Sequence, residues 1–261
     1  MGRPTTKPTV SKSSASKSSI TNANKAKSTQ RPLKVEILSW NVNDLADRIM
    51  GNKASNPDFI QTITKCDIFC LQETKGELKV PNFRCFNSIR SDSRSGGLCI
   101  GISQPFANYL KILDTKKFSM DFQAARLSRK LTGLEKDTII INVYDSPENS
   151  SYKMKLKANG SFVETLCKVD EFINTLPSHS NLIVLGDFNA RTGNENTYSC
   201  NESESFDSLN NGRFVTEKTI TPLPRVSVDN MLNERGKKLL EFGTEQNLYS
   251  TQRFHHWGRS W

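Results

Sequence analysis

The strongest constraint on the fold is an apolar run that stops abruptly at polar residues. The segment Asn181–Gly193, NLIVLGDFNARTG, begins as a strand would and then changes to Gly, Asp and Asn. Ligands of α/β proteins gather at the carboxyl ends of strands, so Asp187 and Asn189 stand where a site is expected. An Asp and an Asn at a strand end are also ordinary turn residues. This segment alone therefore leaves both a site and a plain turn open.

Three earlier apolar segments also deliver polar residues at their ends. These residues are Asn41 after Lys34–Trp40, Glu73 after Cys66–Leu71, and Asn142 and Tyr144 in and after Asp137–Val143. Each of these three residues alone can also have a purely structural role. Asn41 can be a turn residue, Glu73 a solvated carboxylate, and Tyr144 an aromatic residue that packs on the sheet. Their common position at strand ends instead favours a single shared site.

The order of these segments also carries a family resemblance. The motifs, in chain order, are SWNVNDL, CLQET, GGLCIGIS, NVYDSPENS, GDFNARTG and NERGKKLLEFGTEQNL. They resemble the endonuclease/exonuclease/phosphatase family, and most closely the apurinic-type endonuclease domain of LINE-type non-LTR retrotransposons. The resemblance runs from about Leu33 to the end and is most specific at CLQET and GDFNARTG. It implies an α/β fold, a DNase I-like sandwich of two sheets.

The resemblance also implies a metal centre. It assigns Glu73 as a ligand of Mg²⁺, with Asn41 beside it, and Mn²⁺ is the alternative metal. Mg²⁺ prefers oxygen donors and usually takes only one or two protein carboxylates, which agrees with this assignment. No small-molecule cofactor is expected.

The catalytic roles follow from the same resemblance. Asp187 would orient or deprotonate the attacking water, and Asn189 would hold that water or a phosphate oxygen as a neutral donor. Tyr144 would donate a hydrogen bond to the scissile phosphate, and Asn142 is expected to bind substrate.

The chain departs from the family pattern in several places. Asp145 stands where the family usually has an apolar residue or Ala, and Asp44 where Gly is common, at a turn that can require a positive φ. The resemblance further implies that the last two strands, with an Asp and a His, are lacking from this sequence. His255 and His256 precede the expected position of those strands, and His179 is expected to be solvated. The chain would then be a fragment of a longer product, with a reverse transcriptase downstream, or a decayed copy.

Composition limits the class of protein. The 261 residues are 35% hydrophobic, and no apolar run approaches the roughly 20 residues of a membrane helix. Mean hydropathy is −0.55, so we expect a soluble protein with no membrane partner. The N-terminal stretch has no apolar segment of the kind that a signal peptide requires, so no signal peptide is expected. The six cysteines are scattered, which favours reduced thiols in an intracellular compartment, nuclear or cytoplasmic.

Charge separates the chain into two parts. Residues 1–32 carry seven cations and no acid, out of a net charge of +9 for the whole chain. This segment has few large apolar residues, so we expect a disordered basic tail followed by one domain over residues 33–261. The tail is interpreted either as an arm for nucleic-acid binding or nuclear targeting, or as a plain solvated leader.

Helix signals place the remaining elements. Asn56 and Pro57 predict a short helix to about Lys65, and Asn233–Asn247 predicts another. A helix over Phe162–Leu176 is expected from its apolar period, with Ser161 and Glu164 at capping-box spacing. Residues 194–225 show no usable period, which predicts a long surface loop.

The sequence thus predicts a metal-dependent DNA endonuclease that nicks target DNA and leaves a 3′-hydroxyl to prime reverse transcription. Two alternatives stay open. One is a phosphatase or phosphodiesterase acting on another phosphate ester, because the same core serves several substrates. The other is a non-catalytic remnant that binds nucleic acid through its basic tail.

Overall fold

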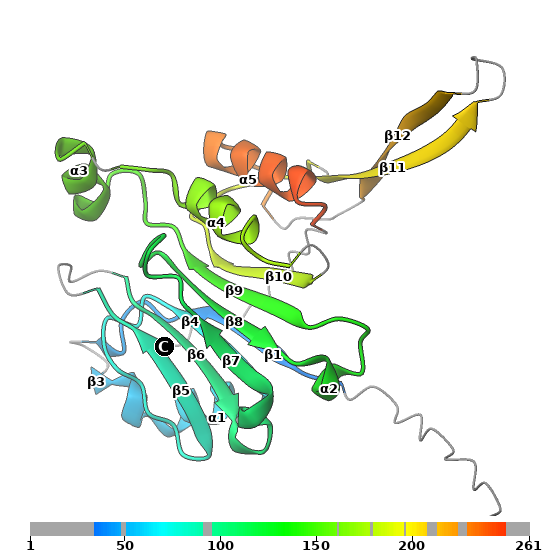
Figure 1. Cartoon of the computed structure of the whole chain (residues 1–261). Coiled ribbons are helices and arrows are strands. Elements are labelled where there is room, and N and C mark those ends of the chain that lie inside the picture. The colour runs from blue at the N-terminus through cyan, green and yellow to red at the C-terminus, as the bar shows by residue number, and fades with distance from the viewer. Residues whose placement is uncertain are drawn as a thin grey trace, which may run out of the picture. The chain divides into compact units, whose positions relative to one another are not determined.

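Two four-stranded sheets form the framework of the chain (Figure 1). The computed structural model describes residues 34–47, 51–90, 96–160, 162–177, 180–195, 197–207, 213–223 and 229–248. Contacts divide the chain into Met1–Arg31 and Pro32–Trp261, and every described residue belongs to the second unit. The basic tail predicted for residues 1–32 lies outside the described residues.

Each sheet contains one parallel pair of strands. The first sheet has the order β1 (Ile37–Asn41), β4 (Ile68–Gln72), β6 (Leu98–Ser103), β5 (Phe83–Ser88). The second has the order β10 (Asn181–Asp187), β9 (Thr138–Tyr144), β8 (Phe122–Leu127), β7 (Leu110–Leu113). The β1–β4 and β10–β9 pairs are parallel, and the other neighbours are antiparallel.

The two sheets pack face to face. Ile68 and Cys70 of the first sheet share one buried cluster with Ala125 and Ile140 of the second. Because side chains alternate along a strand, Phe69 and Leu71 point the other way and pack with Phe59 and Ile63 of α1 (Pro57–Ile63).

The outer face of the second sheet is covered in the same manner. Its side chains pack with Val169 and Phe172 of α4 (Thr165–Ile173) and Phe242 of α5 (Glu234–Glu245). Figure 1 shows both helices over the β9–β10 side of this sheet. The structure confirms the predicted two-sheet α/β sandwich.

The remaining elements are short. They are β2 (Ala46–Asp47), β3 (Gly51–Asn52), α2 (Arg129–Thr132), α3 (Ser151–Ala158) and the 3₁₀ helices η1 (Lys53–Ser55) and η2 (Gln104–Tyr109). None of the helices in the described residues is long and apolar enough to cross a membrane. Every cysteine whose side chain is described is a free thiol.

Two predicted helices are confirmed with their caps. The side chain of Asn56 accepts hydrogen bonds from the backbone N–H groups of Asp58 and Phe59, and Pro57 is the first residue of α1. The side chain of Asn233 caps α5 by accepting from the N–H of Gly236. Both helices therefore begin where a side-chain acceptor satisfies otherwise unpaired donors.

The helix predicted over Phe162–Leu176 is shorter than expected. It begins at Thr165, and Glu164 occupies the N-cap position without a side-chain cap bond, so the predicted capping box is wrong. Phe162 precedes the helix and lies under the ammonium groups of Lys153 and Lys157, at 5.7 Å and 4.9 Å. Phe162 fitted the apolar period of the helix, but it is only partly buried and contacts these lysines instead of the core beneath α4.

The long loop predicted for residues 194–225 is also wrong. Two strands, β11 (Thr197–Asp207) and β12 (Arg213–Leu223), pair antiparallel along their whole length. A two-stranded ribbon is held by backbone hydrogen bonds and needs no alternating apolar face, so the search for a period missed it. The enrichment of Thr, Val and Ile in β12 was the available signal.

Close packing at Gly101 gives a test of the first sheet. A Cβ on Gly101 would lie 2.0 Å from the ring of Phe69, its cross-strand partner in β4. We expect Gly101→Ala to lower the free energy of unfolding by about 1–3 kcal/mol, because the ring cannot move within a filled core. Gly76→Ala is the matched control, since its nearest neighbour is a backbone oxygen at 3.9 Å. Equal urea midpoints for the two variants would contradict this packing.

Candidate active site

The predicted polar residues meet where the two parallel strand pairs end. Asn41 is the last residue of β1, and Glu73 follows the last residue of β4. In the other sheet, Tyr144 ends β9 and Asp187 ends β10, and these two residues are register partners. The sandwich thus brings residues that lie far apart in the chain to one edge.

A single amide joins the two carboxylates of this edge. Asn41 Nδ2 donates to Glu73 Oε1 at 2.8 Å and to Asp187 Oδ2 at 2.6 Å. Asn41 Oδ1 accepts from the backbone N–H of Asn43 at 2.9 Å, which fixes the orientation of the amide. Glu73 follows a strand of the first sheet and Asp187 ends a strand of the second, so the Asn41 amide bridges the two sheets at the site.

The loop that carries Glu73 has an unusual backbone. Glu73 has a φ of +54°, and Asp44 in the facing loop has a φ of +79°, which confirms the predicted need for a positive φ at Asp44. The N–H of Asp44 donates to the carbonyl of Glu73 at 2.7 Å, and the N–H of Thr74 donates to Gly97 at 3.2 Å. Strained backbone persists where neighbouring bonds determine it, so these bonds fix the backbone from which the Glu73 side chain extends.

Asp187 and Asn189 are held by each other. The N–H of Asn189 donates to Asp187 Oδ1 at 2.9 Å. Asn189 Nδ2 donates to the carbonyl of Asp145 at 3.0 Å and lies 3.4 Å from Asp187 Oδ2. Both amide hydrogens therefore have acceptors within the protein, and the group that Asn189 leaves for a ligand is Oδ1, an acceptor. The predicted donor role would require one of these bonds to open.

Tyr144 lies beside both carboxylates. Its side chain is largely buried, and the guanidinium of Arg90 is 5.6 Å from the centre of its ring. Burial raises the pKa of the Tyr144 phenol well above its usual range, and the charge and hydrogen bond of Glu73 and the charge of Asp187 raise it further. Arg90 opposes this shift. The hydroxyl therefore stays protonated, and it donates its hydrogen bond to the carboxylate of Glu73.

Asn142 does not face this site. Its side chain is 0% exposed, its Oδ1 accepts from Gln72 Nε2 at 2.6 Å, and its Nδ2 donates to the carbonyl of Leu71 at 3.1 Å. These bonds join β4 to β9 beneath the site. The prediction that Asn142 binds substrate is therefore corrected, because an inward-facing amide in the sandwich interior has no access to a ligand.

A buried ion pair next to Tyr144 was not predicted. Arg90 pairs with Asp121, both side chains are at most 5% exposed, and the carbonyl of Asp121 accepts from the N–H of Tyr144 at 2.8 Å. Arg90 Nη1 also donates to Ser146 Oγ at 3.3 Å. Arg90 lies in the polar run SIRSDSRSGG, which carries no signal of burial.

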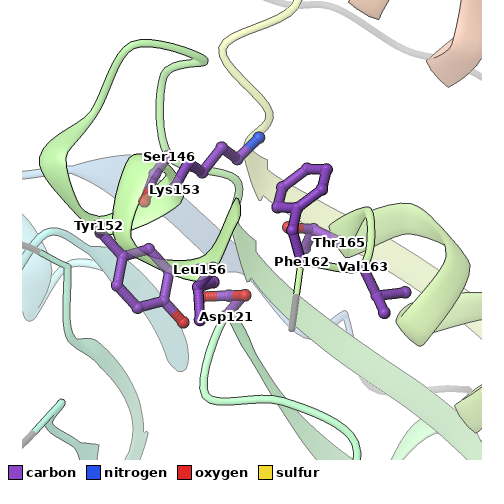
Figure 2. A pocket seen from close by; sticks show the side chains of 8 residues that line it. All are labelled: Asp121, Ser146, Tyr152, Lys153, Leu156, Phe162, Val163 and Thr165. Carbon is purple, nitrogen blue, oxygen red and sulfur yellow. The ribbon is translucent and has the colours of Figure 1, made fainter. Parts of the chain in front are cut away.

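A narrow crevice adjoins this ion pair (Figure 2). Its lining residues are Asp121, Ser146, Tyr152, Lys153, Leu156, Phe162, Val163 and Thr165. Lys153 and Thr165 contact Asp145, whose departure from the family pattern is the one sequence signal that points here.

The donor set of the site suits a hard divalent cation. No cluster of three or more His, Cys, Asp or Glu side chains able to hold a metal exists among the described residues. The carboxylates of Glu73 and Asp187 offer only oxygen ligands in a small number, and the Asn41 amide would have to rotate to turn its Oδ1 toward an ion, because its Nδ2 now faces both carboxylates. Mg²⁺ accepts one or two protein carboxylates and keeps several waters, so these residues fit one such ion. His179, His255 and His256 lie outside the described residues.

Comparison with known proteins returned structural likenesses alone. No family profile and no curated protein matches the chain. The chain is similar to the crystal structure of AP endonuclease LMAP from Leishmania major, at 14% identity and a TM-score of 0.45, with 60% of this chain and 56% of that chain covered. It is also similar to the Xenopus laevis APE2 catalytic domain, at 19% identity and a TM-score of 0.39, with 61% and 60% covered.

The human Nocturnin catalytic domain gives a third likeness, at 16% identity and a TM-score of 0.38, with 60% of this chain and 64% of that chain covered. The chain therefore spans less than two thirds of each of these three chains. At such identities, activity has to be argued from the residues of the site.

The environment of Tyr144 gives a test of the site's electrostatics. We expect Glu73→Gln to lower the pKa of Tyr144, because the charge of Glu73 contributes to raising it. Alkaline ultraviolet titration measures this, with Tyr144→Phe identifying the contribution of Tyr144. An unchanged Tyr144 titration in Glu73→Gln would show that the two side chains do not interact.

Proposed function

We propose that this chain is a metal-dependent phosphodiesterase domain whose substrate is DNA. The observation that carries the proposal is the pair of carboxylates from the two sheets, Glu73 and Asp187, joined by the Asn41 amide. A hydroxyl donor, Tyr144, and an amide, Asn189, stand at the same edge. Phosphodiester hydrolysis needs these parts: a cation site, a base for water and donors to the phosphate.

In this proposal, Glu73 would hold Mg²⁺, or Mn²⁺ in its place, and Asn41 would join it after its amide rotates to present Oδ1. When bound, the ion supplies positive charge that stabilises the phosphate oxygens as their negative charge grows. Asp187 accepts the proton of the attacking water, because its Oδ1 is already oriented by the N–H of Asn189.

The remaining side chains orient the reactants. Asn189 Oδ1 accepts a hydrogen bond from the same water, since its N–H hydrogens are held by Asp145 and Asp187. Tyr144 turns its hydroxyl from Glu73 and donates a hydrogen bond to a phosphate oxygen, and its raised pKa keeps the hydroxyl protonated at neutral pH.

The choice of DNA and of the biological setting rests on the sequence. The resemblance of CLQET and GDFNARTG to the retrotransposon endonucleases supports nicking of target DNA. The 3′-hydroxyl at the nick would prime reverse transcription by a reverse transcriptase domain located downstream in the full-length product. The seven cations of residues 1–32 would strengthen binding to the phosphate backbone. An intracellular location, nuclear or cytoplasmic, belongs to the same proposal.

Nicking of supercoiled plasmid tests this proposal. The purified chain is expected to convert supercoiled plasmid to open circles in Mg²⁺ and to stop when the metal is chelated. Glu73→Gln keeps the size of the side chain and removes its charge, so it should lower the rate by about 100-fold or more. Glu171→Gln on the exposed face of α4 is the matched control and should cleave as the parent chain does.

Other outcomes identify the alternatives. Release of inorganic phosphate from phosphomonoesters with intact plasmid would replace the nuclease by a phosphatase. A folded chain that binds DNA in low salt and cleaves no phosphate ester in any metal would contradict catalysis and leave a nucleic-acid-binding remnant.

A further inference from the structure

Asp145 is the centre of a buried charge cluster that joins three helices to the site. The Asp145 side chain is 9% exposed, and Lys153 Nζ of α3 lies 2.9 Å from Asp145 Oδ1. Thr165 Oγ1, at the start of α4, donates to the same oxygen at 2.8 Å. Arg235, from the first turn of α5, pairs with Asp145 Oδ2. We call these four residues, Asp145, Lys153, Thr165 and Arg235, the Asp145 anchor.

Burying these charged side chains carries a desolvation penalty, which is offset only when all of them are paired. The Lys153 side chain is only 4% exposed and that of Arg235 is 19% exposed. Buried charges are tolerated when each is paired and hydrogen-bonded, and removing one partner leaves the others uncompensated. The anchor thus defines one arrangement of α3, α4 and α5 around the residue that follows Tyr144.

The backbone of Asp145 connects this anchor to the reacting groups. Its N–H donates to the carbonyl of Asp187 at 2.8 Å. Its carbonyl accepts from Asn189 Nδ2 at 3.0 Å and from Arg235 Nη2 at 3.1 Å. One carbonyl oxygen is therefore shared between the predicted catalytic amide and a guanidinium that also binds the carboxylate of the same residue.

Arg235 is itself held against the loop that carries Asn189. The side chain of Asn233 accepts from the N–H of Arg191 at 3.1 Å, and the N–H of Asn233 donates to the carbonyl of Arg191 at 2.9 Å. A Cβ on Gly236 would lie 1.8 Å from the Arg191 carbonyl oxygen, so the first turn of α5 is in close contact with this loop. Arg235 has little freedom to leave Asp145 while α5 is in place.

From these contacts we propose that Asp145 and Arg235 are positioning residues for Asn189. Arg235 clamps the carbonyl and carboxylate of Asp145 together, and the clamped carbonyl orients the Asn189 amide so that its Oδ1 faces the ligand side. Asn189 has a φ of +46°, and the bond of its backbone N–H to Asp187 and that of its side chain to Asp145 stabilise this backbone. The catalytic consequence rests on the proposed function, whereas the orientation of Asn189 can be measured without it.

The test compares three variants of the full chain. Arg235→Met removes the guanidinium while keeping an unbranched side chain. Arg235→Lys restores a cation that can reach one acceptor of Asp145 but cannot bridge both. Lys238→Met is the matched control, because Lys238 lies on the same helix and its ammonium makes an exposed pair with Glu164 at 2.9 Å.

The first readout is the side-chain amide of Asn189 by NMR, assigned from the signal that Asn189→Asp removes. We expect its hydrogen exchange to rise about tenfold or more in Arg235→Met, to be intermediate in Arg235→Lys, and to stay unchanged in Lys238→Met. Exchange that is equal in all three variants and the parent would overturn the proposal. If Arg235→Met does not fold, the comparison of Arg235→Lys with the parent decides by the same criterion.

The second readout is steady-state nicking. Arg235→Met should lower kcat by about 10- to 100-fold, since a misplaced group costs this much, while KM stays within about twofold. A proportionate rise in KM with constant kcat would assign Arg235 to substrate binding and contradict positioning. Failure of the parent chain to cleave would refute the proposed function, and the NMR readout would still decide whether Arg235 orients Asn189.

Discussion

The amide of Asn41, which donates to one carboxylate from each sheet, is the interaction on which the site depends. Glu73 and Asp187 are 114 positions apart by their residue numbers, and only the packing of the two sheets brings them to the same donor. A change in the register of β1 against β4 by one residue would turn Asn41 to the opposite face of its sheet. The bonds of Asn41 to the two carboxylates therefore depend on the register of the strands inside the core.

The layer beneath the site explains how that edge is kept in position. Gln72 and Asn142 are buried where the two sheets meet, and their side chains bond to each other and to backbone carbonyls. Such a buried polar pair is tolerated because its members have partners, and it fixes the relative position of β4 and β9 where an apolar contact would allow sliding. Glu73 follows the last residue of β4 and Tyr144 is the last residue of β9, so this pair also fixes the positions of Glu73 and Tyr144 relative to each other.

Much of the fold could be predicted from the sequence because its signals are local. Apolar runs ending in polar residues predicted β1, β4, β9 and β10, and Asn56 and Asn233 predicted the starts of α1 and α5. The positive φ of Asp44 was expected from the resemblance, because Gly is common at this position in the family and Asp tolerates that conformation better than most residues. Each of these features is decided by a few neighbouring residues.

The features that could not be predicted depend on partners distant in sequence. Asn142 looks like the other polar residues in a strand, and only the opposing sheet decides that it faces inward. Asp145 and Arg90 are charged residues in polar segments, and their burial follows from cations or acids supplied by other elements. The β11–β12 ribbon is formed by backbone pairing that leaves no period in the side chains.

The most direct measurement of the central claim is a crystal structure of the full chain soaked with Mn²⁺, read from its anomalous signal. The account predicts one strong peak at direct coordination distance from the carboxylate of Glu73, close to Asn41 and Asp187. A peak elsewhere on the chain, with the Asn41 amide still bonded to both carboxylates, would contradict a metal centre at this edge.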